Sequence, residues 1–298
     1  MIKGVVLSIL ASCLFGLLYY YPVLLHPLSV IDIFCWRLLT SFPAIVILIL
    51  IEKQWSAIHL LFVRIKTHPL LLIGLLCSSL LLTVQMMIFI WAPINGHGLS
   101  ASLGYFLLPL TMVISGQLFY QEKLSFLQKI AVGLAALGVA IEIVNTGAFS
   151  WETAVIALGY PVYFMTRRKL QIEGIAGTFS DFFFIFIGCL IYFILNYSWD
   201  EIIHDMTSFP IFIPMLGIIT AIAFAMYFVA RRLLPMGLFG LLGYVEPVLL
   251  SMVSVLFLHE SVSSEHIISY GLIWLSVCVL ALEGSLFVLR AIKRKRIR

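Results

Sequence analysis

The stretches "LGYFLLPLTMVISGQLFYQEK" (Leu103–Lys123) and "LLGYVEPVLLSMVSVLFLHES" (Leu241–Ser261) indicate an internal repeat. At an offset of 138 residues they superpose a proline, a phenylalanine and a glutamate: Pro109 with Pro247, Phe119 with Phe257, and Glu122 with Glu260. The alternative is accidental similarity between two apolar segments. The proline and the glutamate keep the same separation of 13 residues in both copies, which argues against that alternative.

Composition places the chain in a membrane. It has 298 residues, of which 62% are hydrophobic and 11% charged, and its mean hydropathy is +1.13. A soluble domain has roughly a quarter of its residues charged, so this chain cannot cover its apolar side chains with polar ones. The five cysteines lie inside apolar runs and form no CxxC pair. We therefore predict no disulfide framework, no metal site and no cofactor.

Runs of the right length define the spans. A helix needs about 20 apolar residues to cross a membrane core of about 30 Å. Such runs predict an all-α polytopic membrane protein with ten transmembrane helices, at about 4–25, 30–51, 69–92, 98–120, 126–146, 151–166, 177–197, 211–230, 237–258 and 266–289. The start resembles a signal peptide, but its apolar run continues to Leu25. We interpret it as a retained first span.

Lysine and arginine alternate from loop to loop. Of the 18 lysines and arginines, 17 fall in every second connecting segment or terminus. These 17 are Lys3, Lys53, Arg64, Lys66, Lys123, Lys129, the three at 167–169, the two at 231–232, and the six in the tail "RAIKRKRIR" at 290–298. The alternate loops have none, and the loop at 198–210 carries acidic residues instead. Positive residues stay in the cytoplasm, so we predict that both termini are cytoplasmic. Beside an apolar span, the basic tail indicates a membrane anchor and not nucleic-acid binding.

Topology reporters test this arrangement. Reporters fused at 95–97 and 203–207 are expected to read external, and one at Arg298 internal, because a false or missed span would break the alternation of charge. An internal reading at 203–207 would overturn the topology.

The repeat must be inverted. The offset spans five predicted helices, and an odd number of spans per copy turns the second copy upside down in the membrane. We expect a first five-helix repeat at 1–147 and a second at 148–298. Inverted repeats are a hallmark of secondary transporters, whose substrate site lies near the midplane between the halves.

Three stretches carry a resemblance to a known family. "FIWAPINGHGLSASLGYFLLPL", "DIFCWRLLTSFP" and a Phe-x-x-Glu after each proline-bearing span resemble RarD proteins, which are EamA permeases of the drug/metabolite transporter superfamily. The resemblance covers nearly the whole chain and implies two inverted EamA units around a central cavity in a bacterial inner membrane. The RarD name is associated with chloramphenicol sensitivity, and related proteins export amino acids or metabolites. This chain departs from the family pattern at Ser100, where relatives commonly have glutamate, and at Gln85-Met86, where they often have Asn-Trp.

Arg37 is a candidate substrate-binding residue. It lies seven residues into the second span, roughly 10 Å deep at 1.5 Å per residue. An unpaired arginine there costs at least about 2.5 kcal/mol, so its side chain faces the protein interior or extends to the surface. A structural ion pair, for example with Asp32, is one interpretation. The other is a clamp on a substrate carboxylate or phosphate.

Glu246 is the second charged candidate. It lies nine residues into the ninth span, ~14 Å along the axis and near the middle of the core. Burial disfavours the charged form of a carboxyl group, so Glu246 could be neutral at rest and ionise when a cation or amine arrives. Pro247 would kink the same helix. Both residues suit a cavity-lining face, and the alternative is a buried glutamate bonded to a neighbouring helix.

Further polar and aromatic residues complete the candidates. We predict an aromatic-lined pocket, and the substrate-binding set besides Arg37 and Glu246 consists of Gln85, Trp91, Tyr105, Tyr163 and Tyr244. Tyr19, Tyr20 and Tyr21 fit an interfacial belt. Four carboxylates near span ends are expected at the interface: Asp32, Glu142, Asp181 and Glu283. Glu122 and Glu260 are expected to make loop or cap contacts, and "NGHG" predicts a turn.

The function that follows is secondary transport. We expect a permease or exporter for a small metabolite, an amino-acid-like compound or a drug, with protons as the candidate coupling ion and a monomer or homodimer as the assembly. Apart from its substrate, the lipid bilayer is the expected partner. No P-loop indicates ATP as the driver, and no HExxH, Gly-x-Ser-x-Gly or paired aspartate motif indicates an enzyme. A lipid scramblase or structural membrane protein and, less favoured, a membrane-embedded enzyme are the alternatives.

Overall fold

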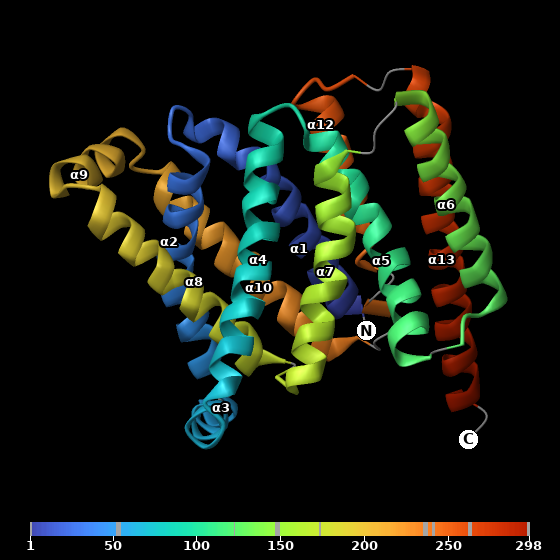
Figure 1. The fold of residues 1–298 in the computed structure, drawn as a ribbon, viewed down its shortest axis with the longest axis horizontal. Coiled ribbons are helices and arrows are strands. Elements are labelled where there is room, and N and C mark those ends of the chain that lie inside the picture. Colours follow the sequence, from blue (N-terminus) through green and yellow to red (C-terminus); the bar gives the residue numbers. More distant parts are fainter. Residues whose placement is uncertain are drawn as a thin grey trace. The chain divides into compact units, whose positions relative to one another are not determined.

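The computed structural model describes residues 2–51, 55–121, 123–146, 150–172, 174–234, 238–239, 242–261 and 264–296, and within them it contains helices and connecting turns but no strand (Figure 1). The helices of the first half of the chain are α1 (Ile2–Tyr20), η1 (Tyr21–Leu25), α2 (Val30–Ile51), α3 (Trp55–Thr67), α4 (Leu70–Ile94), α5 (Gly98–Tyr120) and α6 (Phe126–Thr146). Those of the second half are α7 (Trp151–Leu170), α8 (Ile175–Asn196), α9 (Trp199–Ser208), α10 (Phe212–Leu233), α12 (Val245–Leu256) and α13 (Ser264–Arg296).

The helices match the predicted spans closely. Among the described residues, 8 helical segments are long and apolar enough to cross a membrane. α7 is not one of them, since its ends carry Glu152 and a basic run at 167–169. α12 is apolar but has only 12 residues. The chain is therefore a multi-pass membrane protein, and the count of ten spans stays a prediction.

Two helices lie where the sequence suggested loops. α3 is amphipathic and packs Ile58 and Leu61 into the protein. α9 begins with a capping box, in which the Ser198 hydroxyl accepts from the Glu201 N–H and the Glu201 carboxylate accepts from the Ser198 N–H. This exchange satisfies two amides that an exposed helix end would leave unbonded. Both segments are too short and too charged for a search based on long apolar runs.

The ninth predicted span is corrected. We expected a helix kinked at Pro247, but α12 begins at Val245, directly after a turn at Gly243 and Tyr244. The Gly243 N–H donates to the Phe239 carbonyl at 3.1 Å. A proline in the first turn breaks no hydrogen bond, and a glutamate there is favoured by the helix dipole. Pro235 and Gly237, where the span was expected to begin, lie outside the described residues.

The described contacts divide the chain into two compact units. Unit 1 comprises Met1–Gly16, Ala92–Pro161 and Met226–Arg298, and unit 2 comprises Leu17–Trp91 and Val162–Ala225. Four helices, α1, α4, α7 and α10, contribute a segment to each unit.

Unit 1 is built on helix pairs. α6 and α13 run side by side (Figure 1), and α5 packs against α12. Gly138 of α6 makes the first pair tight, because a Cβ there would lie 2.8 Å from the Ser269 carbonyl oxygen. The buried core of this unit is apolar and consists of Leu99, Leu103, Phe106, Leu107, Leu110, Ala131, Ala135, Ala157, Tyr270, Ile273, Val277 and Leu280.

Unit 2 is built around α2 and α8, which pack against each other, and α3 also packs on α8. Phe42 of α2 stacks on Phe186 of α8 with ring centroids 4.5 Å apart. A smaller core under α3 contains Leu61, Leu71, Leu75 and Ile172.

Candidate functional site

Arg37 of α2 is buried in unit 2, with only 4% of its surface exposed. Its Nε donates to the Thr220 hydroxyl of α10 at 3.2 Å. The guanidinium lies over the Phe89 ring of α4, 5.3 Å from the centroid. Tyr19 packs edge-on against the same ring at 5.0 Å. Helices far apart in sequence thus contact this cation with a hydroxyl and an aromatic face, both of which suit a guanidinium.

A close helix approach brings Thr220 to Arg37. Gly217, one turn before Thr220 on α10, lies against Thr40 of α2, and a Cβ at Gly217 would overlap the Thr40 hydroxyl oxygen. Any larger residue would push the two helices apart. The glycine therefore positions the hydroxyl that holds the arginine.

Asp32 has partners other than the expected arginine. Its carboxylate accepts from the Tyr192 hydroxyl at 2.9 Å and from the Ser29 backbone N–H at 3.2 Å. These bonds anchor the first turn of α2 to α8.

The interfacial interpretation of Tyr19 is wrong, since this side chain has 0% exposure. A belt residue keeps its polar tip in the headgroup region, whereas the Tyr19 ring packs inside unit 2 against Phe89. Tyr21 donates its hydroxyl to the Phe212 carbonyl at 3.0 Å.

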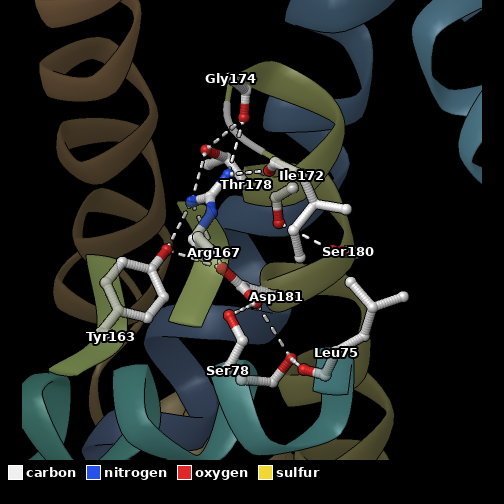
Figure 2. A network of polar contacts seen from close by, with 11 residues as sticks. Leu75, Ser78, Tyr163, Arg167, Ile172, Gly174, Thr178, Ser180 and Asp181 are labelled. Atoms are coloured by element: carbon white, nitrogen blue, oxygen red, sulfur yellow. Dashed lines mark hydrogen bonds and ion pairs between the residues drawn. The ribbon is translucent and has the colours of Figure 1, made fainter. Parts of the chain in front are cut away.

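Asp181 of α8 is the centre of a second polar network in unit 2 (Figure 2). Its side chain has 0% exposure. It accepts from the hydroxyls of Ser78 at 2.8 Å, Ser79 at 3.2 Å and Tyr163 at 2.7 Å. Arg167 forms an ion pair with it at 3.5 Å. Asp181 was expected at the interface because it lies near the start of α8. Its carboxylate is nevertheless enclosed by protein.

Arg167 joins this network to the turn between α7 and α8 (Figure 2). Its Nη1 donates to the Tyr163 hydroxyl at 2.5 Å, and its Nη2 donates to the carbonyls of Ile172 at 3.1 Å and Gly174 at 2.8 Å. A helix leaves its last carbonyls without intrahelical donors, and this guanidinium supplies donors for carbonyls of the turn that follows α7. Gly177 leaves the necessary space, because a Cβ there would overlap Nη2.

Sequence reasoning missed this network. Arg167 belongs to a basic run and was counted only as a marker of topology. The spacing of Tyr163 and Arg167, four residues apart on one helix face, is a local signal that could have found half of it. The serines at 78 and 79 lie in an apolar run, and nothing in the sequence links them to Asp181 more than 100 residues later.

Glu246 lies in unit 1, half-buried in the first turn of α12. It is close enough to Tyr227 of α10 to interact with it electrostatically. The Tyr227 ring packs edge-on against Phe239 at 4.8 Å and Phe15 at 6.3 Å. A carboxylate that interacts with a tyrosine, whose ring packs against two phenylalanines, is a suitable contact for an organic cation.

The other sequence-predicted site residues are distributed over both units. Gln85 is buried on α4, one turn before Phe89, so it shares a face with the ring that covers Arg37. Trp91 is half-buried on the same helix. Tyr163 belongs to the Asp181 network. In unit 1, Tyr105 packs on Tyr160 with centroids 5.9 Å apart, and Tyr244 packs against the apolar core.

Carboxylates also fasten helix ends in unit 1. Glu260 accepts from the first two amides of α5, those of Gly98 at 2.8 Å and Leu99 at 2.7 Å, which confirms the expected cap contact. The Nδ1 of His97 lies 2.6 Å from the Glu152 carboxylate. The "NGHG" turn is confirmed at Asn95 and Gly96. Glu122 lies outside the described residues.

Glu142 of α6 binds α13. It pairs with His266 at 2.7 Å and accepts from the Ser269 hydroxyl. Like Asp181, it lies near a helix end yet is buried in protein. Among the described residues, no group of three or more His, Cys, Asp or Glu side chains could hold a metal ion.

No family model matches the chain. The chloramphenicol-sensitive protein RarD of Pseudomonas aeruginosa is 40% identical over 98% of this chain and 98% of its own length. The uncharacterized transporter PM1281 of Pasteurella multocida is 39% identical over 95% of this chain and 97% of its own length. Protein RarD of Escherichia coli is 26% identical, with 95% coverage of both. A protein of known crystal structure shares the fold, with a TM-score of 0.55, 18% identity, and coverage of 95% of this chain and 98% of that chain.

The apolar helices and these relatives define the class of the protein, which is a multi-pass membrane transporter. Within that class, the resemblance seen in the sequence is confirmed, and the chain belongs to the RarD family of permeases.

Proposed function

We propose that this chain is a secondary transporter of a small metabolite, an amino-acid-like compound or a drug across the bacterial inner membrane. The proposed architecture has ten transmembrane helices as two inverted repeats, 1–147 and 148–298, with a central cavity between the repeats and both termini in the cytoplasm.

Helix pairing supports the inverted repeats. Under the 138-residue offset, α5 and α6 correspond to α12 and α13, and α4 corresponds to α10. Within unit 1, α5 packs on α12 and α6 on α13, so each helix contacts its own counterpart. Packing about a pseudo-twofold axis brings equivalent elements together in this way. The short helices α3 and α9 also fall at matching places in the order of elements.

The start of α12 is the observation that carries the transport proposal. Secondary transporters build their sites from discontinuous helices, whose interrupted backbone is tolerated where it lines a cavity. Here a turn at Gly243 and Tyr244 precedes a new helix with Glu246 in its first turn. Tyr227, which interacts electrostatically with this carboxylate, packs edge-on against Phe239 and Phe15. We propose that this face of unit 1 contacts the substrate or a coupling proton.

Transport into sealed vesicles tests the proposal. A metabolite screen of deletion and overexpression cells, inside and out, identifies candidate compounds, and labelled chloramphenicol is a first probe because the P. aeruginosa relative bears its name. Purified protein is expected to move the compound unchanged across the vesicle membrane. Chemical alteration of the compound would indicate an enzyme, and movement of labelled lipid alone would indicate a scramblase; either result contradicts the proposal.

Glu246→Gln is expected to leave protein abundance intact while abolishing transport or its pH dependence. The amide keeps the shape of the side chain but can neither ionise nor release a proton. Transport is measured in vesicles across a pH series. Asp200→Asn is the matched control, because Asp200 is an exposed acid on α9. Full transport by Glu246→Gln with an unchanged pH profile would remove Glu246 from the mechanism.

A further inference from the structure

α3 must lie at the membrane surface. It connects α2, which ends at Ile51, to α4, which begins at Leu70, and both of these helices are long and apolar enough to cross a membrane. α3 itself has 13 residues, with Arg64 and Lys66 in its last turn. A helix of that length extends about 20 Å, which is too short to cross the core.

α3 has two apolar faces, and only one is covered by the protein. Ile58 and Leu61 are buried, and Leu61 belongs to the small core of unit 2. The other large side chains, Trp55, Leu60, Phe62 and Val63, are exposed. Beside them is a hollow of about 310 Å³ lined by Trp55, Ile58, His59, Phe62, Val63 and Lys66. Walls that are mostly apolar, with His59 among them and Lys66 at one end, suit an amphipathic molecule with an acidic group.

The surroundings of this face are basic. Arg64 donates to the carbonyls of Gln171 at 2.8 Å and Leu170 at 3.1 Å, so the last turn of α3 is fastened to the end of α7. That end carries Arg168 and Lys169, which are exposed like Lys66. Neither 55–72 nor 162–172 contains an aspartate or glutamate. Glu52 and Glu173, the next acids along the chain, lie outside the described residues.

We propose that the exposed face of α3 binds an anionic phospholipid of the surrounding bilayer. The glycerol and upper acyl chain occupy the hollow beside Trp55 and Phe62, and the phosphate group pairs with Lys66 and Lys169. Basic amphipathic helices bind membrane interfaces in this manner, and anionic leaflets attract basic residues close to their surface. A bilayer lipid is the expected occupant of the hollow, because the flanking helices α2 and α4 cross the bilayer beside α3. The inference is independent of the transported substrate and of the side on which α3 lies.

Fluorescence quenching tests the site in the full-length protein. The purified chain is placed in vesicles that contain brominated phosphatidylglycerol or, in a parallel sample, brominated phosphatidylcholine with the same acyl chains. The quenching due to Trp55 is the difference between the wild type and Trp55→Phe. We expect brominated phosphatidylglycerol to quench Trp55 more strongly than brominated phosphatidylcholine does, and we call this difference the lipid preference. The lipid preference is expected to fall about fivefold (about 1 kcal/mol) for each basic residue removed, first in Lys66→Gln and again in Lys66→Gln/Lys169→Gln.

Control samples distinguish lipid binding at this site from a general loss of charge and from binding of free phosphate. Lys129→Gln removes an exposed lysine from α6 in unit 1 and is expected to retain the full preference. Added salt should weaken the preference of the unmodified protein, so the test stands even if a variant fails to fold. Equal quenching by the two lipids would overturn the proposal, as would an unchanged preference in Lys66→Gln/Lys169→Gln. Inorganic phosphate at matched ionic strength should leave the lipid preference unchanged. If inorganic phosphate abolished the preference, the site would bind free phosphate and not a lipid.

Discussion

Asp181→Ala is expected to destabilise the protein by about 3–5 kcal/mol, because it leaves the Arg167 guanidinium buried without its carboxylate. The three hydroxyls that donate to Asp181 also lose their acceptor (Figure 2). A buried charge whose partner is removed costs far more than the intact pair contributes, which makes this site sensitive. Thermal unfolding and the abundance of the detergent-solubilised protein measure the loss.

A double-variant cycle identifies the pair as the cause. Arg167→Ala/Asp181→Ala is expected to cost less than the sum of the two single changes, because removing both charges leaves neither one unpaired. Asp200→Asn serves as the control for loss of an exposed acid and should unfold like the wild type. Wild-type stability in Asp181→Ala, or strict additivity in the cycle, would show that the network does not hold α7 and α8 together.

Arg37→Ala is expected to lower transport roughly 10- to 100-fold at normal abundance, the effect of losing a charged hydrogen bond of about 1.5–3 kcal/mol to the substrate. Arg37 is a buried cation of unit 2 that contacts the Thr220 hydroxyl and the Phe89 ring. We propose that it contacts a carboxylate or phosphate of the substrate, for which arginine has the matching geometry. Uptake or export of the screened compound, normalised to protein level, gives the measurement.

Thr220→Val is the matched control for Arg37. It removes the hydroxyl that accepts from Arg37 Nε while keeping the shape of the side chain and the guanidinium. Transport should survive in Thr220→Val and fail in Arg37→Ala if the charge itself meets the substrate. Loss of protein in Arg37→Ala would assign the arginine a structural role, and normal transport by Arg37→Ala would exclude it from the site.

Local sequence was sufficient for much of the helical framework. The ranges 30–51, 98–120 and 126–146 coincide with α2, α5 and α6. Apolar runs long enough to cross a bilayer are read directly from composition, because the solvent imposes the helix and its length. The charge interruptions and the turn at Asn95 and Gly96 are local in the same sense. Membership of the RarD family also followed from short stretches of residues.

Partner choice depended on tertiary contacts. Ser78 and Asp181 are 103 residues apart, and Arg37 and Thr220 are 183 apart, so no local pattern pairs them. The runs that reveal a span are apolar on all sides and do not indicate which face meets another helix. The start of α12 at Val245 is a similar case, because proline permits either a kink or a first turn. Hydrophobicity places each helix in the membrane, whereas the pairing of a few buried polar groups is settled only when the helices pack.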